Sequence, residues 1–311
     1  MTSSLVFLCG ALRSGTSMTH LMLNAHSQIS NPGEFDFFFD LLAKKGREPT
    51  VNEFFEYLSS DRIFLSKNLR LNPSHETYAE VLEDFVDQLS ENGRRLCLNI
   101  HRNFDLAHRY FPASKFVHII RDPRDVARSS IGMGWAGNVY YGVDHWVNTE
   151  QSWLRVMTNL SESQYVQIQF EELVHTPEQS LAEACVLLGV EYESSMLEYD
   201  ENSRYAKPDR KLTNQWKQKL TDRDIEIVES KASELMTLHG YPLANKVPRP
   251  AARLEKIRFK IRDVLYREKF WIKRYGFWLY VGRRLTAKLG LRQLRKPLLA
   301  KSRMITEKHL K

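Results

Sequence analysis

A short glycine loop near the start of the chain, residues 10–17, has the composition of an anion site and reads Gly-Ala-Leu-Arg-Ser-Gly-Thr-Ser. Backbone N–H groups of such a turn point into its hollow, and a helix that begins directly after it adds partial positive charge. The hydroxyls of Thr16 and Ser17 add side-chain donors. We therefore expect the loop to hold an anion, with a glycine-rich turn that binds nothing as the alternative.

The only fixed charge in this loop is Arg13. A nucleoside-triphosphate site of the usual type has a lysine directly after the second glycine, and Thr16 occupies that position. A planar guanidinium matches two oxygens of a sulfate or phosphate without recruiting magnesium. The loop therefore favours an anion site that needs no metal.

A second charged segment follows the apolar run 116–120 and reads Arg-Asp-Pro-Arg-Asp from Arg121 to Asp125. A buried strand would deliver Arg121 to its carboxyl edge, where ligands of parallel sheets bind, and Pro123 suits the first turn of a helix. Asp125 also lies four residues after Arg121 and three before Arg128. An exposed helix start with salt bridges is therefore the alternative.

Together these motifs resemble those of the sulfotransferases that use 3′-phosphoadenosine 5′-phosphosulfate (PAPS), in consistent order over about residues 5–243. The resemblance rests on Arg13–Ser17, Arg121–Asp125 with Ser129, Phe170–Leu173, Pro177 and Leu187–Gly189. It implies a P-loop-like three-layer α/β fold. It also implies transfer of a sulfuryl group from PAPS, without a metal, to an acceptor hydroxyl or amine. The acceptor that we expect is a carbohydrate, a glycolipid or another small alcohol, and the basic aromatic end of the chain favours a glycolipid or polysaccharide.

The same resemblance implies roles for individual residues. The 5′-phosphosulfate would be held by Arg13, Ser14, Gly15, Thr16 and Ser17. Arg121 and Ser129 would grip the 3′-phosphate. Arg210 and Lys211 resemble a second basic grip on that phosphate, and Phe170 would lie near the adenine.

Two residues resemble catalytic bases of this family. Glu34, within Asn31–Phe35, is similar to the catalytic glutamate of tyrosylprotein and several glycan sulfotransferases, and the phenylalanines at 35 and 37–39 would dry its site. His101 resembles the base in the Lys-x-His segment of cytosolic sulfotransferases, with Asn99 in place of the lysine. We favour Glu34 as the base and expect Arg13 to stabilise the charge on the leaving oxygen.

The elements that must position these residues alternate along the chain. Apolar runs of strand length occur at 5–9, 96–100, 116–120 and 165–168. Helical patterns occur at 16–25, 74–92, 104–110, 123–131, 144–160, 177–188 and 222–239, and residues 200–216 are polar with no clean period, which suggests a loop. This alternation predicts a central parallel sheet flanked by helices.

The charge of the chain, +7 in total, is divided unevenly. Residues 247–311 hold 20 Lys/Arg and 4 Asp/Glu, which is +16, so residues 1–246 carry −9. We expect a sulfotransferase domain at 1–246 and a basic aromatic helical extension at 247–311. Residues 251–296 interleave cations with aromatic and apolar side chains, which suits an anionic membrane surface or a helix docked on the acidic body.

Other features of the composition indicate a cellular setting. The three cysteines lie in or near apolar runs, which suits buried thiols in a reducing compartment, and no signal peptide or membrane-spanning stretch is expected. The expected location is cytoplasmic, peripheral on the inner face of the membrane. Two rival functions are a P-loop kinase that uses ATP and a nucleic-acid binder that acts through the basic extension, although no nucleic-acid partner is expected.

Overall fold

The computed structural model describes residues 5–91, 93–200 and 209–310. By its internal contacts the chain divides into two compact units. The first unit contains residues 1–122 and 145–215, and the second contains residues 123–144 and 216–311. Because the second unit includes residues on both sides of position 246, the predicted domain division there stays a prediction.

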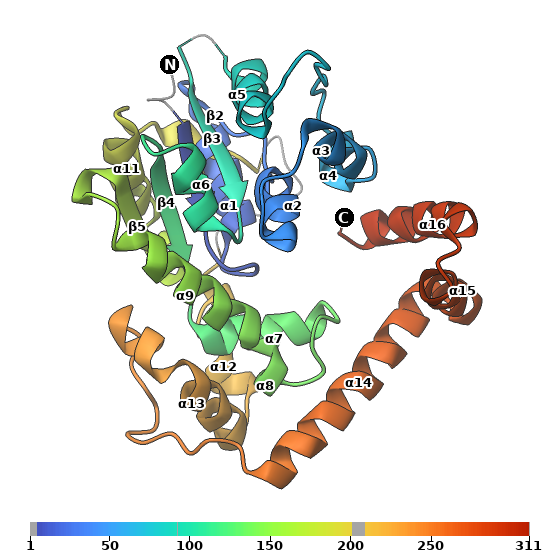
Figure 1. Ribbon diagram of the computed structural model, residues 1–311. Helices are drawn as coiled ribbons and strands as arrows, with labels where there is room; N and C mark the ends of the chain where they lie inside the picture. Colours follow the sequence, from blue (N-terminus) through green and yellow to red (C-terminus); the bar gives the residue numbers. More distant parts are fainter. Residues whose placement is uncertain (1–4, 92, 201–208, 311) are drawn as a thin grey trace. The chain divides into compact units, whose positions relative to one another are not determined.

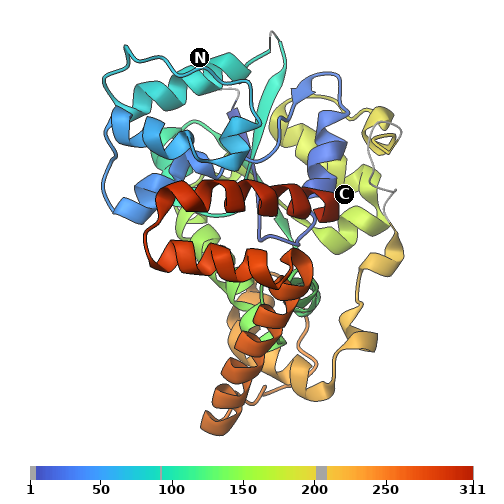
Figure 2. The same cartoon turned by 90° about the vertical axis from the view of Figure 1, so that its right-hand side faces the viewer.

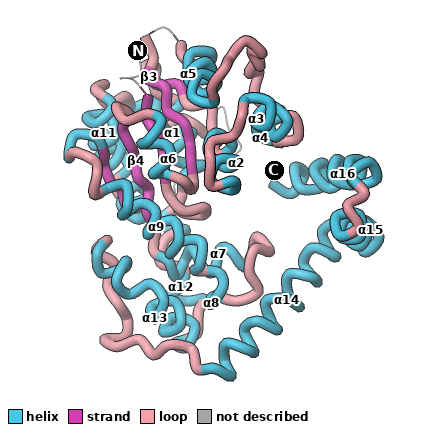
Figure 3. The backbone as a smooth tube through the Cα atoms, in the orientation of Figure 1, coloured by secondary structure: helices cyan, strands magenta, loops and turns pink. Residues whose placement is uncertain are grey.

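The first unit is built on a five-stranded sheet, shown in magenta in Figure 3. Its strands are β1 (Leu5–Cys9), β2 (Ile29–Ser30), β3 (Arg95–Ile100), β4 (Lys115–Ile120) and β5 (Tyr165–Gln169). The order across the sheet is β2-β3-β1-β4-β5, and all pairs are parallel. The predicted parallel sheet is confirmed, and only the two-residue β2 was missed. The carboxyl ends of β1, β3 and β4 therefore lie at one edge.

Helices cover both faces of this sheet (Figure 1). One face packs on α2 (Phe37–Lys45), α3 (Val51–Leu58), α4 (Arg62–Leu65), α5 (Tyr78–Leu89), α6 (Phe104–Tyr110) and α9 (Asp144–Met157). The other face packs on α1 (Thr16–Asn24), α10 (Phe170–His175), α11 (Pro177–Leu188) and the 3-10 turn η3 (Ser194–Leu197). Successive residues of β1 divide between the two cores, as the period of a strand requires. This is the three-layer α/β fold that we predicted.

Local capping signals explain where several helices begin. Thr77 caps α5 and forms a capping box with Glu80, so this helix begins later than the predicted residue 74. Thr50 and Glu53 form the same box at the start of α3. Helices α2, α3 and α4 were not predicted, because their short apolar stretches follow no long helical period.

The second unit is helical. It contains α7 (Pro123–Gly132), α8 (Val139–Gly142), α12 (Trp216–Lys219), α13 (Asp222–Leu238), α14 (Arg253–Tyr275), α15 (Phe277–Lys288) and α16 (Arg292–Leu310). Arg124 of α7 is 1% exposed, its guanidinium lies 3.7 Å from the ring of Trp216, and it pairs with the buried Glu229 at 2.8 Å. Asp125 is also buried and accepts the Trp216 backbone N–H at 2.8 Å. An exposed helix start laced with salt bridges is therefore the wrong interpretation of this segment.

The basic extension forms three helices, of which α15 and α16 lie side by side (Figure 2). Helix α14 docks on the segment before α8. Asp263 accepts the Gly137 N–H at 2.7 Å, and the carbonyl of Phe259 accepts from the Asn138 side chain at 2.8 Å. None of the described helices is both long and apolar enough to cross a membrane. The loop predicted at 200–216 lies outside the described residues at 201–208, and residues 210–212 form the 3-10 turn η4.

Candidate active site

The glycine loop follows β1 and passes close to the neighbouring strand β4. A Cβ atom at Gly10 would lie 2.2 Å from the carbonyl oxygen of Ile119, so only glycine fits at this crossing. The Ser14 N–H then donates to the Ala11 carbonyl at 3.0 Å and closes the turn. Arg13 has a φ of 75°, in the left-handed region that ordinary residues rarely adopt. The turn exposes the side chain of Arg13 while Ser14 is buried.

The second glycine of the loop is the N-cap of α1 and has a φ of 100°. A Cβ atom at Gly15 would lie 2.2 Å from the ring of Phe170, which itself is buried. No side chain caps α1, and although the Met18 N–H donates to the Gly15 carbonyl at 3.0 Å, the N–H groups of Thr16 and Ser17 have no acceptor among the described residues. Phe170 therefore packs against Gly15 and leaves room only for glycine there. The loop backbone can then take the positive φ that turns its N–H groups toward an anion.

Arg121 joins the glycine loop to the end of β4. Its guanidinium donates to the carbonyl of Arg13 at 3.1 Å and to that of Leu212 at 2.5 Å, and it lies 4.5 Å from the centre of the Phe170 ring. The indole N–H of Trp146 also donates to the Arg121 carbonyl at 2.9 Å. Segments 108 residues apart in the sequence therefore meet at one guanidinium.

The remaining residues predicted to contact the 3′-phosphate are divided between the two units. Arg210 and Lys211 are exposed in η4, directly before the Leu212 carbonyl that accepts from Arg121. Ser129 belongs to α7 of the second unit, so its part in a shared phosphate grip stays a prediction. The structure thus brings the loop, Arg121, Phe170 and η4 together within the first unit.

These residues fit a phosphosulfate group. The hydroxyl of Ser14 is buried and has no hydrogen-bond partner among the described residues, as expected of a donor reserved for a ligand. Thr16, also buried, begins α1, and the exposed Ser17 follows it. The loop N–H groups with Ser14 and Thr16 would hold the anionic oxygens, and the guanidinium of Arg13 would balance their charge. Within the described residues, no cluster of His, Cys, Asp or Glu is arranged to hold a metal ion.

Both candidate bases lie at the carboxyl end of β3. Glu34 pairs with Asn99 in a parallel bridge, where the Asn99 N–H donates to the Gly33 carbonyl at 2.9 Å and the Phe35 N–H donates to the Asn99 carbonyl at 2.8 Å. The Asn99 side chain accepts from the Asn31 amide at 3.0 Å. Asn99 therefore fixes the turn that carries the half-buried Glu34.

The other candidate, His101, is buried and bonded on both sides of its ring. Its Nδ1 lies 2.8 Å from the Asp36 carboxylate, and its Nε2 lies 3.2 Å from the hydroxyl of Thr16. Burial alone would lower the pKa of His101, but the hydrogen bond and charge of Asp36 raise it overall. Burial would likewise raise the pKa of Asp36, yet the hydrogen bond from His101 lowers it.

Two basic residues that feel the charge of Glu34, Lys67 and His20, could not be found from the sequence. The ammonium group of Lys67 donates to the Pro32 carbonyl and lies 5.0 Å from the centre of the Phe35 ring. Burial lowers the pKa of Lys67, and the charge of Glu34 partly opposes that shift. His20 of α1 also feels the charge of Glu34, while burial lowers its pKa. Neither residue lies in a motif, so only the fold could reveal them.

The phenylalanines predicted to dry the site have another role. Phe35 and the three at 37–39 are at most 1% exposed and belong to the hydrophobic core under α2. Their rings pack on each other and on those of Phe64 and Phe85. These side chains therefore anchor α2, which begins directly after Asp36, and the prediction that they dry the site stays a prediction.

Comparison with known proteins gives a consistent picture. A family model described as "Sulfotransferase family" matches residues 5–194. An uncharacterized protein of Aquifex aeolicus (strain VF5) is 26% identical over 227 residues, which cover 65% of this chain and 28% of that protein. The chain thus spans little more than a quarter of that relative.

Solved structures share the fold. The sulfotransferase domain of the Synechococcus PCC 7002 olefin synthase aligns with a TM-score of 0.61 and 16% identity, over 77% of this chain and 95% of that domain. The sulfotransferase domain from the curacin biosynthetic pathway aligns with a TM-score of 0.58 and 18% identity, over 76% of this chain and 98% of that domain.

Proposed function

Because this chain belongs to the sulfotransferase family, we propose that it moves a sulfuryl group from PAPS to an acceptor hydroxyl or amine. The observation that carries the proposal is the contact between Arg121 and the carbonyl of Arg13, at 3.1 Å, which unites the loop with the end of β4. A nucleotide with anionic groups at both its 3′ and 5′ positions needs two such grips close together. The acceptor class we favour is a carbohydrate, a glycolipid or another small alcohol.

In this proposal PAPS supplies a sulfuryl group whose bond to a phosphate oxygen breaks as the bond to the acceptor oxygen or nitrogen forms. Glu34 takes the acceptor proton, and the electron pair of the broken bond stays on the leaving phosphate. Arg13, with the loop N–H groups, stabilises the charge that develops there. We favour Glu34 over His101 as the base, because both ring nitrogens of His101 already have partners inside the protein.

Ligand-induced thermal stabilisation separates this function from its rivals. We expect adenosine 3′,5′-bisphosphate alone to raise the melting temperature, because a ligand at 100 times its Kd stabilises the folded state by about 2.7 kcal/mol. A P-loop kinase would instead respond to ATP with magnesium, and a nucleic-acid binder acting through the extension would respond to neither nucleotide. Either of those patterns would contradict the proposal.

Substitution of the proposed base tests its role. Glu34→Gln keeps the shape of the side chain but cannot accept the proton, so we expect kcat to fall by about 10²- to 10⁴-fold with unchanged affinity for adenosine 3′,5′-bisphosphate. Glu56→Gln, the same change on the exposed side of α3, serves as the matched control and should keep full kcat. Steady-state kinetics in which Glu34→Gln retains normal kcat would assign the base elsewhere.

We also propose that the extension attaches the enzyme peripherally to an anionic membrane, on the cytoplasmic side. One face of α14 carries large apolar side chains that are at least half exposed, spaced three or four residues apart from Leu254 to Val264 and followed by the adjacent Leu265: Leu254, Ile257, Ile261, Val264 and Leu265. Cations flank them, and residues 247–311 carry +16. Exposed apolar side chains among clustered cations suit a surface of anionic lipid.

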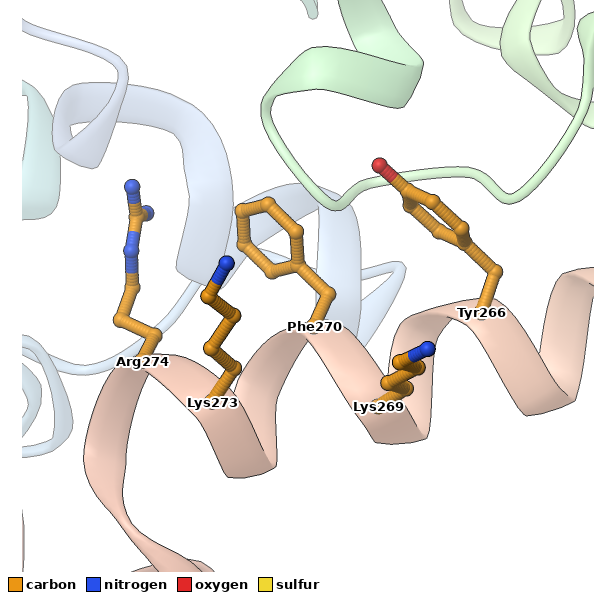
Figure 4. A pocket seen from close by; sticks show the side chains of 5 residues that line it. All are labelled: Tyr266, Lys269, Phe270, Lys273 and Arg274. Atoms are coloured by element: carbon orange, nitrogen blue, oxygen red, sulfur yellow. The ribbon is translucent and has the colours of Figure 1, made fainter.

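A hollow of about 450 Å³ along another side of α14 adds to this basic character. Its lining residues are shown in Figure 4: Tyr266, Lys269, Phe270, Lys273 and Arg274. The guanidinium of Arg274 lies 4.9 Å from the centre of the Phe270 ring. Cations beside aromatic rings are typical of segments that lie at the headgroup level of a membrane.

Vesicle sedimentation tests the attachment. We expect the protein to bind vesicles that contain phosphatidylserine but not vesicles of phosphatidylcholine alone. The double variant Ile257→Glu/Ile261→Glu should lose at least about tenfold in vesicle affinity, because each isoleucine buried in the membrane contributes roughly 2 kcal/mol. Val186→Glu, on an exposed apolar residue of α11, is the matched control and should bind normally. Equal binding to both kinds of vesicle, or no effect of the double substitution, would contradict the proposal.

A further inference from the structure

Three buried side chains form one hydrogen-bonded line that ends in the glycine loop. The Asp36 carboxylate lies 2.8 Å from His101 Nδ1 and also accepts the His101 backbone N–H at 2.8 Å. On the far side of the ring, His101 Nε2 lies 3.2 Å from the Thr16 hydroxyl oxygen. All three residues are only 5% exposed, so the line is shielded from water.

The direction of these hydrogen bonds depends on one proton. An ionised carboxylate can only accept, so the Asp36 side of the ring requires a proton on His101 Nδ1. The other nitrogen, Nε2, then has two states. In the imidazolium it donates to the oxygen of Thr16, whereas in the neutral ring it accepts the hydroxyl proton of Thr16.

The state of the ring therefore decides what Thr16 offers to the loop. When His101 is protonated, the Thr16 oxygen accepts from the ring and its own O–H is released to donate elsewhere. Thr16 is the first residue of α1, and the nearby Ser14 hydroxyl is buried without a partner among the described residues. A donor aimed into the loop at this point would bind an anionic oxygen.

The surrounding charges favour the protonated ring. Asp36 and Glu34 face His101 and raise its pKa, against the effects of burial and of Arg102. The guanidinium of Arg102 is itself held by both carboxylate oxygens of Asp40, at 2.6 and 2.5 Å. From α9, Thr149 contributes only a neutral hydroxyl, which donates to the His101 carbonyl.

We propose that Asp36 and His101 are positioning residues that turn the Thr16 hydroxyl toward the anionic end of the sulfuryl donor while the imidazole is protonated, so that nucleotide affinity falls as the pH rises. The inference rests on the proposed sulfotransferase function and extends it to control of donor binding by pH. His101 then acts through Thr16 and not on the acceptor.

Calorimetric titration with adenosine 3′,5′-bisphosphate between about pH 5.5 and 9 tests the proposal without turnover. At the acidic end, the wild type should bind the nucleotide at least about tenfold more tightly than Thr16→Val, because a hydrogen bond to a charged group contributes a tenfold gain in affinity or more. At the alkaline end, the two proteins should bind the nucleotide equally. Thr16→Ser keeps the hydroxyl and should behave as the wild type. Phosphate ionisation also changes the affinity with pH, but it affects both proteins equally. The ratio of the wild-type affinity to the Thr16→Val affinity at each pH is therefore free of it.

Nuclear magnetic resonance of the ligand-free protein supplies a second readout. The His101 ring should titrate above its ordinary pKa of 6.5, and Asp36→Asn should lower that pKa because it removes the charge and acceptor beside the ring. A wild-type advantage over Thr16→Val that is independent of pH, or a His101 pKa at or below 6.5, would overturn this inference and leave the sulfotransferase proposal standing. Absence of nucleotide binding at every pH would overturn both.

Discussion

The candidate site depends on the packing of one aromatic ring between a glycine and a guanidinium. Phe170 lies so close to Gly15 that no side chain fits there, and Arg121 covers the same ring at 4.5 Å while it donates to the Arg13 carbonyl. The ring thereby fixes the loop backbone on one side and the end of β4 on the other. A pre-formed cradle costs little to organise when an anion binds, which is why the N–H groups of such loops bind anions well.

The two candidate bases depend on a second constraint, the pairing of the Glu34 turn with β3. Asn99 holds this turn through two backbone hydrogen bonds and one hydrogen bond that its side chain accepts from the Asn31 side chain. The same strand end delivers His101 to Asp36 and Thr16, so the turn and the glycine loop are joined by a buried polar line. The candidate base and the glycine loop are consequently held at one edge of the same sheet.

Features that depend on neighbouring residues in the chain could be predicted from the sequence. The strands and the glycine loop could be predicted because apolar runs and turn glycines follow the periods of the backbone. Asp36, His20 and Lys67 could not, because each reaches the site through tertiary packing and lies in no motif. The packing of the phenylalanines at 37–39 could not be predicted for the same reason, since a run of aromatic residues does not state which face of a helix it covers. Likewise, Arg124 has the sequence pattern of a surface charge, but it is buried against Trp216 and Glu229, which are distant in the sequence.

The most direct test of the central claim is a crystal structure with adenosine 3′,5′-bisphosphate bound. The account predicts the 5′-phosphate oxygens within about 2.7–3.2 Å of the backbone nitrogens of residues 15–17, and the 3′-phosphate on the guanidinium of Arg121. A nucleotide bound elsewhere, or one whose phosphates contact only one of these two segments, would contradict the claim that loop and strand end form a single cradle.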